Sequence, residues 1–276
     1  MTKTYWPQVI ATHIALIAYS ALALFPVLLV IVNSLKNKLL IFSAPFALPN
    51  ASSFTLDGYK TLQATANFPA FFLNSLLVTG GSLLLILLVS SMAAFALSEY
   101  TFRLNTLAAL YLAIGIMVPI RLGTVGILQL AVGLHLVNTL WILILVYTAQ
   151  GIPLAVFILT AFMRQLPKDL KDAARIDGAS EYRIYWLTLP LVRPAIGSVL
   201  AISMIPIWND LWFPLILAPG ESTKTIVLGA SVFLGQFVND YNAVLAALTL
   251  AIVPAVVLYF IFSQQLIRGI TSGAVK

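Results

Sequence analysis

The stretch 241–267 carries no charged side chain between Asp240 and Arg268. A helix of about 20 apolar residues crosses the hydrocarbon core of a bilayer, so this stretch alone points to a membrane protein. Five further stretches are similarly long and apolar, and only two of them contain a charged residue. We therefore predict six transmembrane helices, at 12–33, 73–97, 106–131, 139–162, 194–217 and 241–267.

The composition indicates that lipid is the solvent for most of this chain. Of its 276 residues, 61% are hydrophobic and 9% are charged, whereas soluble domains carry roughly 25% charged residues. A soluble fold of this length has too little interior for so much apolar surface. We expect a single all-α integral membrane domain over 1–276, with a cytoplasmic loop at 163–193 and external loops at 34–72 and 218–243.

The net charge of +6 fits membrane orientation better than nucleic-acid binding, because the charges lie between the neutral stretches. Six spans place both termini on the same side of the membrane. Ten of the 15 Lys and Arg residues fall on that side and five on the other. The positive-inside rule therefore predicts that both termini are cytoplasmic.

The third predicted span, 106–131, is irregular. It contains Pro119, Gly123 and Gly126, together with Arg121. Proline removes a backbone donor, and the freed carbonyl group then needs another partner or water. Two structures fit this pattern: a helix that breaks near Pro119 and lines a cavity, or a helix that ends at Val118 and is followed by a re-entrant loop.

Charged residues crowd into the cytoplasmic loop 163–193. Pro167 suits the first turn of a helix, and Gly178 suits its end. Ser180 can cap a second short helix that runs to Pro190. This pattern predicts a helix–Gly–helix element that docks on another protein through a face of small residues. The alternative is an amphipathic hairpin on the inner leaflet, although leaflet-binding helices are usually strongly basic.

The same loop resembles the cytoplasmic signature of ABC-importer permeases, which reads Glu-Ala-Ala, three residues, Gly, nine residues and Ile-x-Leu-Pro. Here Asp172-Ala173-Ala174 is followed by Gly178 and, after eight residues, by Leu187-Thr188-Leu189-Pro190. Asp172 thus replaces Glu, Leu187 replaces Ile, and the spacing is one residue shorter. The strings DAARIDGASEYRIYW, WNDLWFPLI and LIRGITSGAVK are similar to the carbohydrate branch of that family, which includes maltose and glycerol-3-phosphate importers.

The resemblance implies a permease fold whose short cytoplasmic helix sits in a groove of an ATPase subunit. It also implies a sister permease, two ATPase subunits that bind ATP and Mg, an external sugar-binding protein, and a prokaryotic inner membrane. This chain has no phosphate-binding loop of its own, so we expect it to bind no cofactor and not to be an enzyme. The residues expected to dock on the ATPase are Leu170, Asp172, Ala173, Ala174, Arg175, Asp177 and Gly178.

Candidates for the substrate path are polar or aromatic residues within or beside the spans. Asp210, with Trp208, Asn209 and Trp212 around it, could bind a sugar or join two helices by hydrogen bonds. Asn74 could line the path or begin a helix. Arg121 could bind an anionic sugar derivative or extend to the outer interface.

The external loop 218–243 resembles the family segment that reaches into the binding protein. Gly229 and Gly235 would permit a tight reversal there, although an ordinary structured loop explains the same sequence.

Two other classes of membrane protein compete with the importer. An ion-coupled secondary transporter could use Asp210 as its ion carrier, but such transporters often show paired broken helices in two halves. A membrane enzyme would need a nucleophile and base or metal ligands, and no such grouping occurs in the sequence. The chain has no cysteine, and its two histidines, His13 and His135, lie far apart, so we expect no metal site.

Overall fold

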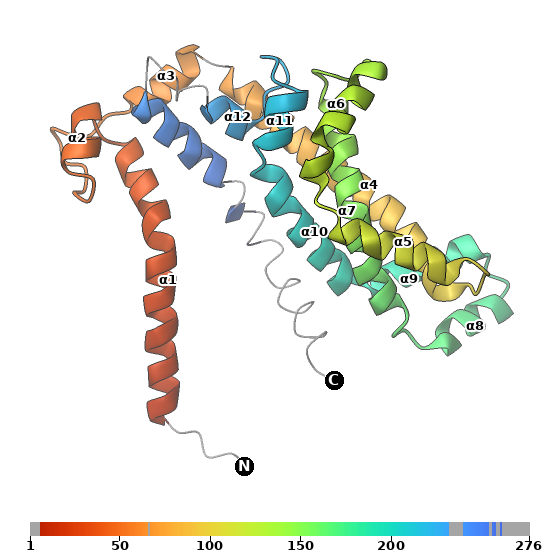
Figure 1. Ribbon diagram of the computed structural model, residues 1–276. Coiled ribbons are helices and arrows are strands. Elements are labelled where there is room, and N and C mark those ends of the chain that lie inside the picture. The colour runs from red at the N-terminus through yellow and green to blue at the C-terminus, as the bar shows by residue number, and fades with distance from the viewer. Residues whose placement is uncertain (1–5, 66, 232–239, 254–255, 258–259, 261–276) are drawn as a thin grey trace. The chain divides into compact units, whose positions relative to one another are not determined.

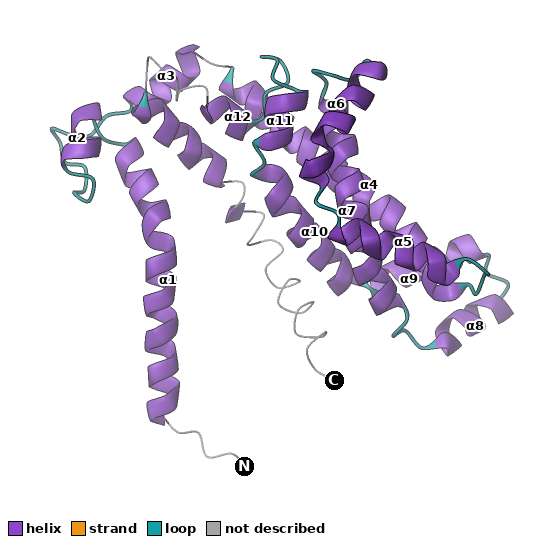
Figure 2. Cartoon of the chain, viewed as in Figure 1, coloured by secondary structure: helices purple, strands orange, loops and turns teal. Residues whose placement is uncertain are grey.

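A computed structural model describes residues 6–65, 67–231, 240–253, 256–257 and 260. This part of the chain is helical, apart from turns, loops and one isolated antiparallel bridge between Lys36 and Phe54 (Figure 2). Two compact units are present: Met1–Phe68 with Gly229–Val253, and Pro69–Leu228 with Pro254–Lys276. We call them the smaller and the larger unit.

The larger unit holds most of the helices, and α7 lies at its centre. In Figure 1, α4 and α10 run alongside α7, α8 and α9 lie at one end, and α6 and α11 lie at the other. Its helices are α4 (Phe68–Glu99), α5 (Asn105–Met117), η1 (Ile120–Gly123), α6 (Thr124–Gly133), α7 (Leu140–Met163), α8 (Lys168–Ile176), α9 (Glu181–Leu191), α10 (Arg193–Trp208) and α11 (Trp212–Leu217). The helix α12 (Ile226–Ser231) lies at the boundary of the two units.

Small residues let α4 and α7 pack closely. A methyl group added at Gly151 would lie 2.4 Å from the Cδ1 atom of Ile86. The hydroxyl groups of Ser82 and Ser90 each donate a hydrogen bond to a carbonyl oxygen of α7, at 3.4 Å. Packing of small residues with hydrogen bonds between helices is typical of membrane domains, where lipid provides no hydrophobic force between helices.

The described chain contains three helices long and apolar enough to cross a membrane: α1 (Trp6–Ser34), α4 and α7. Two bent pairs raise the number to five if each pair forms one span. In the first pair, α5 and the η1–α6 segment meet at 86°, with the break at Val118 and Pro119 where the sequence predicted it. That geometry fits a broken span and a re-entrant loop equally.

The predicted span 194–217 is not a single helix. The helix α10 ends at Trp208, and α11 begins only at Trp212. The break contains Asp210, whose carboxylate accepts hydrogen bonds from the backbone N–H groups of Trp212 and Phe213, so a side chain replaces the helical acceptors there. The second bent pair joins α10 to α9 instead, at 73°.

The last predicted span, 241–267, is described only in part. The helix Tyr241–Val253 covers its beginning, and most of the remainder lies outside the described residues.

The smaller unit contains α1, α2 (Lys38–Ser43), α3 (Asp57–Thr65) and the helix Tyr241–Val253. Lys36, only 1% exposed, organises the segment between α1 and α3. Its ammonium group donates to the Asn33 side-chain oxygen (3.1 Å) and to the carbonyl oxygens of Ala44 (3.0 Å) and Pro45 (3.2 Å). All three acceptors are neutral, and burial lowers the pKa of Lys36.

We expect Lys36→Met to loosen this segment by about 1–3 kcal/mol, because it leaves the buried Asn33 side-chain oxygen without a donor and removes one of the two donors to each of the Ala44 and Pro45 carbonyl oxygens. Relief of the buried charge offsets only part of that loss. Limited proteolysis of the detergent-solubilised protein should show faster cleavage between α1 and α3. Lys38→Met is the matched control, because Lys38 is exposed. Equal cleavage rates in the two variants would contradict the prediction.

Candidate functional site

The loop between α7 and α10 forms the predicted helix–Gly–helix element. The helix α8 ends beside Gly178, whose φ of +77° lies in the left-handed region that glycine adopts without strain. The Ser180 hydroxyl group then accepts a hydrogen bond from the Arg183 N–H and so caps α9, as the sequence predicted. The residue types at these positions therefore fix the turn between the two short helices.

A cluster of charged residues fastens α8 to the end of α4. Glu99, the last residue of α4, forms ion pairs with Lys171 and with Arg175, the latter at 2.6 Å between Oε1 and Nη2. The side chains of Glu99 and Lys171 are only 10% and 9% exposed. We call Glu99, Tyr100, Lys171, Asp172, Arg175 and Glu181 the Glu99 cluster.

Arg175 links the two short helices as well as α4. Its guanidinium group also contacts Glu181 (2.9 Å) and Asp172 (3.0 Å), and the Tyr100 hydroxyl group donates to Glu181 (2.9 Å). Hydrogen bonds to Glu181, and next to Glu99, raise the pKa of Arg175, so this group stays charged at every physiological pH. The Glu99 cluster thus joins α4, α8 and α9 into one rigid corner.

The other face of α8 is open to solvent. Leu170 is 54% exposed and Ile176 is 86% exposed, and Ala173, Asp177 and Gly178 are exposed too. Ala174 is half-buried. Arg175, also predicted from the sequence to dock on the ATPase, instead forms ion pairs with Glu99 and Glu181. Ile176 was missed, although an isoleucine in so charged a loop is a visible signal.

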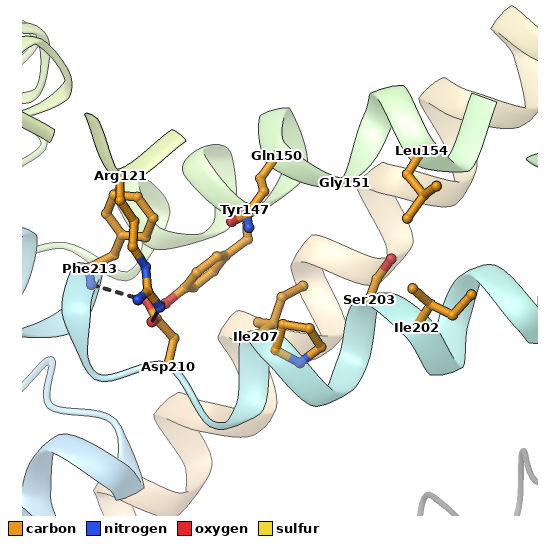
Figure 3. A pocket seen from close by; sticks show the side chains of 11 residues that line it. Arg121, Tyr147, Gln150, Gly151, Leu154, Ile202, Ser203, Ile207, Asp210 and Phe213 are labelled. Carbon is orange, nitrogen blue, oxygen red and sulfur yellow. Dashed lines mark hydrogen bonds and ion pairs between the residues drawn. The ribbon is translucent and has the colours of Figure 1, made fainter. Parts of the chain in front are cut away.

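A second candidate site is a cavity of about 190 Å³ in the larger unit, between α7 and α10 (Figure 3). Its walls are mainly apolar, with polar groups at one end and in the middle. The lining residues used below are Arg121, Tyr147, Gln150, Ser203, Asp210 and Phe213.

Asp210 is the most densely bonded side chain of this cavity. Its carboxylate accepts hydrogen bonds from Arg121 Nη2 (3.1 Å), the Tyr147 hydroxyl (2.8 Å), Trp212 N (3.3 Å) and Phe213 N (3.1 Å). Asp210 therefore joins η1, α7 and α11 by hydrogen bonds and also lines the cavity. Arg121, for which the sequence suggested an anion or the outer interface, instead pairs with Asp210.

The three residues grouped with Asp210 from the sequence, Trp208, Asn209 and Trp212, do not line this cavity. Trp208 is buried and packs edge-on against Phe72. The exposed Asn209 side chain bonds back to the Ile205 carbonyl, and the Trp212 indole donates to Thr124. Sequence reasoning missed Tyr147, Gln150 and Ser203. These residues could have been recognised as polar side chains within the otherwise apolar stretches 139–162 and 194–217.

The remaining predicted residues fall elsewhere. Asn74 lies inside α4, which begins at Phe68, so it does not start the helix. It is also absent from the residues that line the cavity. It is buried, and its amide group donates to the carbonyl oxygens of Ser222 (2.9 Å) and Lys224 (3.0 Å). Gly229 lies within α12 and makes no tight reversal, since its neighbours are helical. Gly235 lies outside the described residues.

In the described part of the chain, no group of three or more His, Asp or Glu side chains could hold a metal ion. The chemistry that these residues offer is hydrogen bonding and ion pairing, in the Glu99 cluster and in the cavity.

Comparison with known proteins identifies the class. The model of the family described as "Binding-protein-dependent transport system inner membrane component" matches residues 14–272. The chain belongs to this family, and it is a multi-pass membrane protein. The family resemblance drawn from the loop 163–193 is thereby confirmed.

Individual relatives match along nearly the whole chain. A probable starch degradation products transport system permease protein of Thermoanaerobacterium thermosulfurigenes is 31% identical over 100% of both chains. The diacetylchitobiose uptake system permease protein of Streptomyces coelicolor is 30% identical over 96% of this chain and 88% of its own. The melibiose/raffinose/stachyose import permease of Bacillus subtilis is 33% identical over 91% of both.

The fold also matches a solved structure, that of a bacterial ABC transporter involved in the import of the acidic polysaccharide alginate. The TM-score is 0.80, and the match covers 96% of this chain and 98% of the other, at 16% identity. The larger and smaller units therefore have the fold of an ABC importer permease. The ion-coupled secondary transporter is not favoured by these relatives.

Proposed function

We propose that this chain is one of two membrane-spanning subunits of an ATP-driven importer, and that the cargo is a sugar. The proposal rests on family membership and on relatives whose names specify starch products, diacetylchitobiose, melibiose, raffinose and stachyose. A sister permease would form the other half of the path. An external binding protein would deliver the sugar, and two ATPase subunits would bind ATP and Mg.

In the proposed topology the chain crosses the membrane six times. The last crossing begins with the helix Tyr241–Val253, and both termini are cytoplasmic, as the distribution of Lys and Arg indicates. The helix–Gly–helix element then faces the cytoplasm, and the loop after α11 faces the binding protein.

The observation that carries the proposal is the two-sided character of α8. Its outer face presents Leu170, Ala173 and Ile176 to solvent, as a partner groove requires. Its inner face holds the Glu99 cluster, which fixes α8 to the end of the long helix α4. A force applied to α8 by closing ATPase subunits would therefore pass directly into α4.

The function is tested by producing the chain together with its sister permease, ATPase and binding protein. We expect all membrane and ATPase subunits to copurify, and ATP-dependent sugar uptake into proteoliposomes. Stable uptake by the chain alone, driven by an ion gradient, would overturn the proposal.

The Glu99 cluster supplies a separate prediction. Glu99→Gln leaves Lys171 buried beside a neutral group, and removing one partner of a buried pair costs about 3–5 kcal/mol. We expect sugar uptake and binding-protein stimulation of ATP hydrolysis to fall together. Glu99→Asp, which keeps the negative charge between Lys171 and Arg175, should retain part of both.

Asp57→Asn is the control for this experiment, because the Asp57–Lys60 pair is 70% and 77% exposed and such pairs contribute little. If the binding protein stimulates ATP hydrolysis by the Glu99→Gln importer as strongly as by the wild-type importer, then contacts other than the Glu99 ion pairs hold α8.

A further inference from the structure

The cavity between α7 and α10 contains polar groups that no described residue satisfies. Gln150 lies near the middle of α7, about 15 Å from its start at Leu140 by helical rise. Ser203 lies on α10, and Figure 3 shows its hydroxyl group pointing toward α7 across the cavity. Within the described chain, neither side chain forms a hydrogen bond, although both line the cavity.

Polar side chains in an otherwise apolar wall are placed to form hydrogen bonds with a molecule that enters the cavity. Gln150 is exposed and Ser203 is half-buried, so both can reach a molecule that enters from the open side. A cavity of about 190 Å³ is smaller than the roughly 300–1,000 Å³ that holds a drug-sized ligand. It therefore suits one small ring and not a whole oligosaccharide.

The charges of the cavity cancel. Arg121 and Asp210 are the charged residues that line it, and they pair at 3.1 Å. The Arg121 side chain is 65% exposed and, among described residues, its guanidinium group donates only to Asp210, so other N–H groups remain for a ligand oxygen. A carboxylate entering the cavity would meet Asp210, whereas hydroxyl groups would meet donors and acceptors together.

We propose that this cavity binds one ring of an uncharged sugar during its passage, through Gln150, Ser203 and the Arg121–Asp210 pair. The inference deepens the proposed function and depends on it. Gln150 and Ser203 hydrogen-bond the ring hydroxyl groups, and the neutral pair selects against uronic acids. Apolar residues such as Phe213 and Leu154 line the rest of the cavity.

Because the natural chain has no cysteine, a single introduced thiol reports on the cavity. In the assembled importer carrying Ser203→Cys, we expect raffinose, an uncharged trisaccharide, to protect position 203 from a thiol reagent. The labelling rate should fall about threefold when the raffinose concentration is twice its dissociation constant. Trigalacturonate, a trisaccharide of uronic acids, should not protect. The control is Gln129→Cys on α6, an exposed position that does not line the cavity, where raffinose should change nothing.

Uptake provides the second measurement. Gln150→Leu with Ser203→Ala should reduce raffinose uptake about tenfold, the loss of roughly two neutral hydrogen bonds. The controls are Gln129→Leu on α6 and Ser198→Ala on α10, neither of which lines the cavity. Copurification of the ATPase monitors assembly of every variant.

Each outcome is decisive. Protection by raffinose alone, with reduced uptake by an assembled double variant, supports the proposal. Absence of protection, or equal protection by trigalacturonate, overturns it. Loss of assembly in the double variant would place Gln150 and Ser203 in a subunit contact and also overturn it. If the wild-type importer takes up no sugar at all, the proposed function fails instead.

Discussion

Gly178→Val is expected to separate ATP hydrolysis from sugar uptake. Gly178 has a φ of +77°, and no atom lies within 4 Å of the position that a Cβ atom would take. The cost of the substitution is therefore conformational: a left-handed residue with a side chain costs roughly 1–2 kcal/mol, and a β-branched residue is especially disfavoured there. The chain can relieve this strain by changing the angle between α8 and α9.

A changed angle would move the exposed face of α8 out of register with the ATPase groove while leaving the membrane helices intact. We expect uptake to fall by a factor of about 5–30, the equivalent of that energy, and ATP hydrolysis to persist without stimulation. The measurement is the ratio of sugar transported to ATP hydrolysed in proteoliposomes.

Gly178→Asn is the matched control, because asparagine adopts positive φ more readily than other residues with side chains. It should retain most of the uptake. Wild-type uptake by Gly178→Val, with normal assembly, would show that α8 is not the element through which the ATPase acts.

The elements of this chain that follow from local chemistry were predictable. Apolar length gave the positions of α1, α4 and α7, because lipid allows only helices across its core. Pro119 marked the break after α5, and Gly178 with Ser180 marked the turn between α8 and α9. Pro119 and Gly178 end a helix by their residue type, and Ser180 begins the next one.

The parts of the candidate sites that depend on distant contacts were not predictable. The sequence placed Arg175 on the docking face, because nothing near it indicates that Glu99, 76 positions away, would accept its guanidinium group. It also gave no sign that the helix within 194–217 breaks at Asp210, because the partners of Asp210 on η1 and α7 are remote in sequence. Hydropathy measures each stretch alone and cannot pair polar side chains between helices.

Asp210→Asn is expected to destabilise the larger unit far more than the near-identical size of the two side chains suggests. All four groups around the carboxylate act as donors: Arg121, the Tyr147 hydroxyl, and the N–H groups of Trp212 and Phe213. An amide NH₂ in place of either oxygen must face at least one N–H group. The least costly orientation points it toward Tyr147, whose hydroxyl can also accept, and leaves the Phe213 N–H unsatisfied.

A buried, unsatisfied donor costs about 1–3 kcal/mol, and the hydrogen bonds to a charged acceptor are lost in addition. We therefore expect a loss of at least about 2 kcal/mol, measured as a lower unfolding midpoint of the detergent-purified importer. Asn209→Ala is the neighbouring control, because Asn209 is exposed and, among the described residues, its side chain bonds only to the Ile205 carbonyl of α10; its effect should stay within about 0.5 kcal/mol.

Combining Asp210→Asn with Tyr147→Phe shows whether the loss of stability comes from the hydrogen bonds to Asp210. Tyr147→Phe removes one of the four donors, so the two substitutions should be non-additive, and Asp210→Asn should cost a different amount in that background. The opposite result is equally informative. If Asp210→Asn unfolds at the wild-type temperature but transports poorly, the carboxylate contributes to passage of the cargo and not to holding η1, α7 and α11 together.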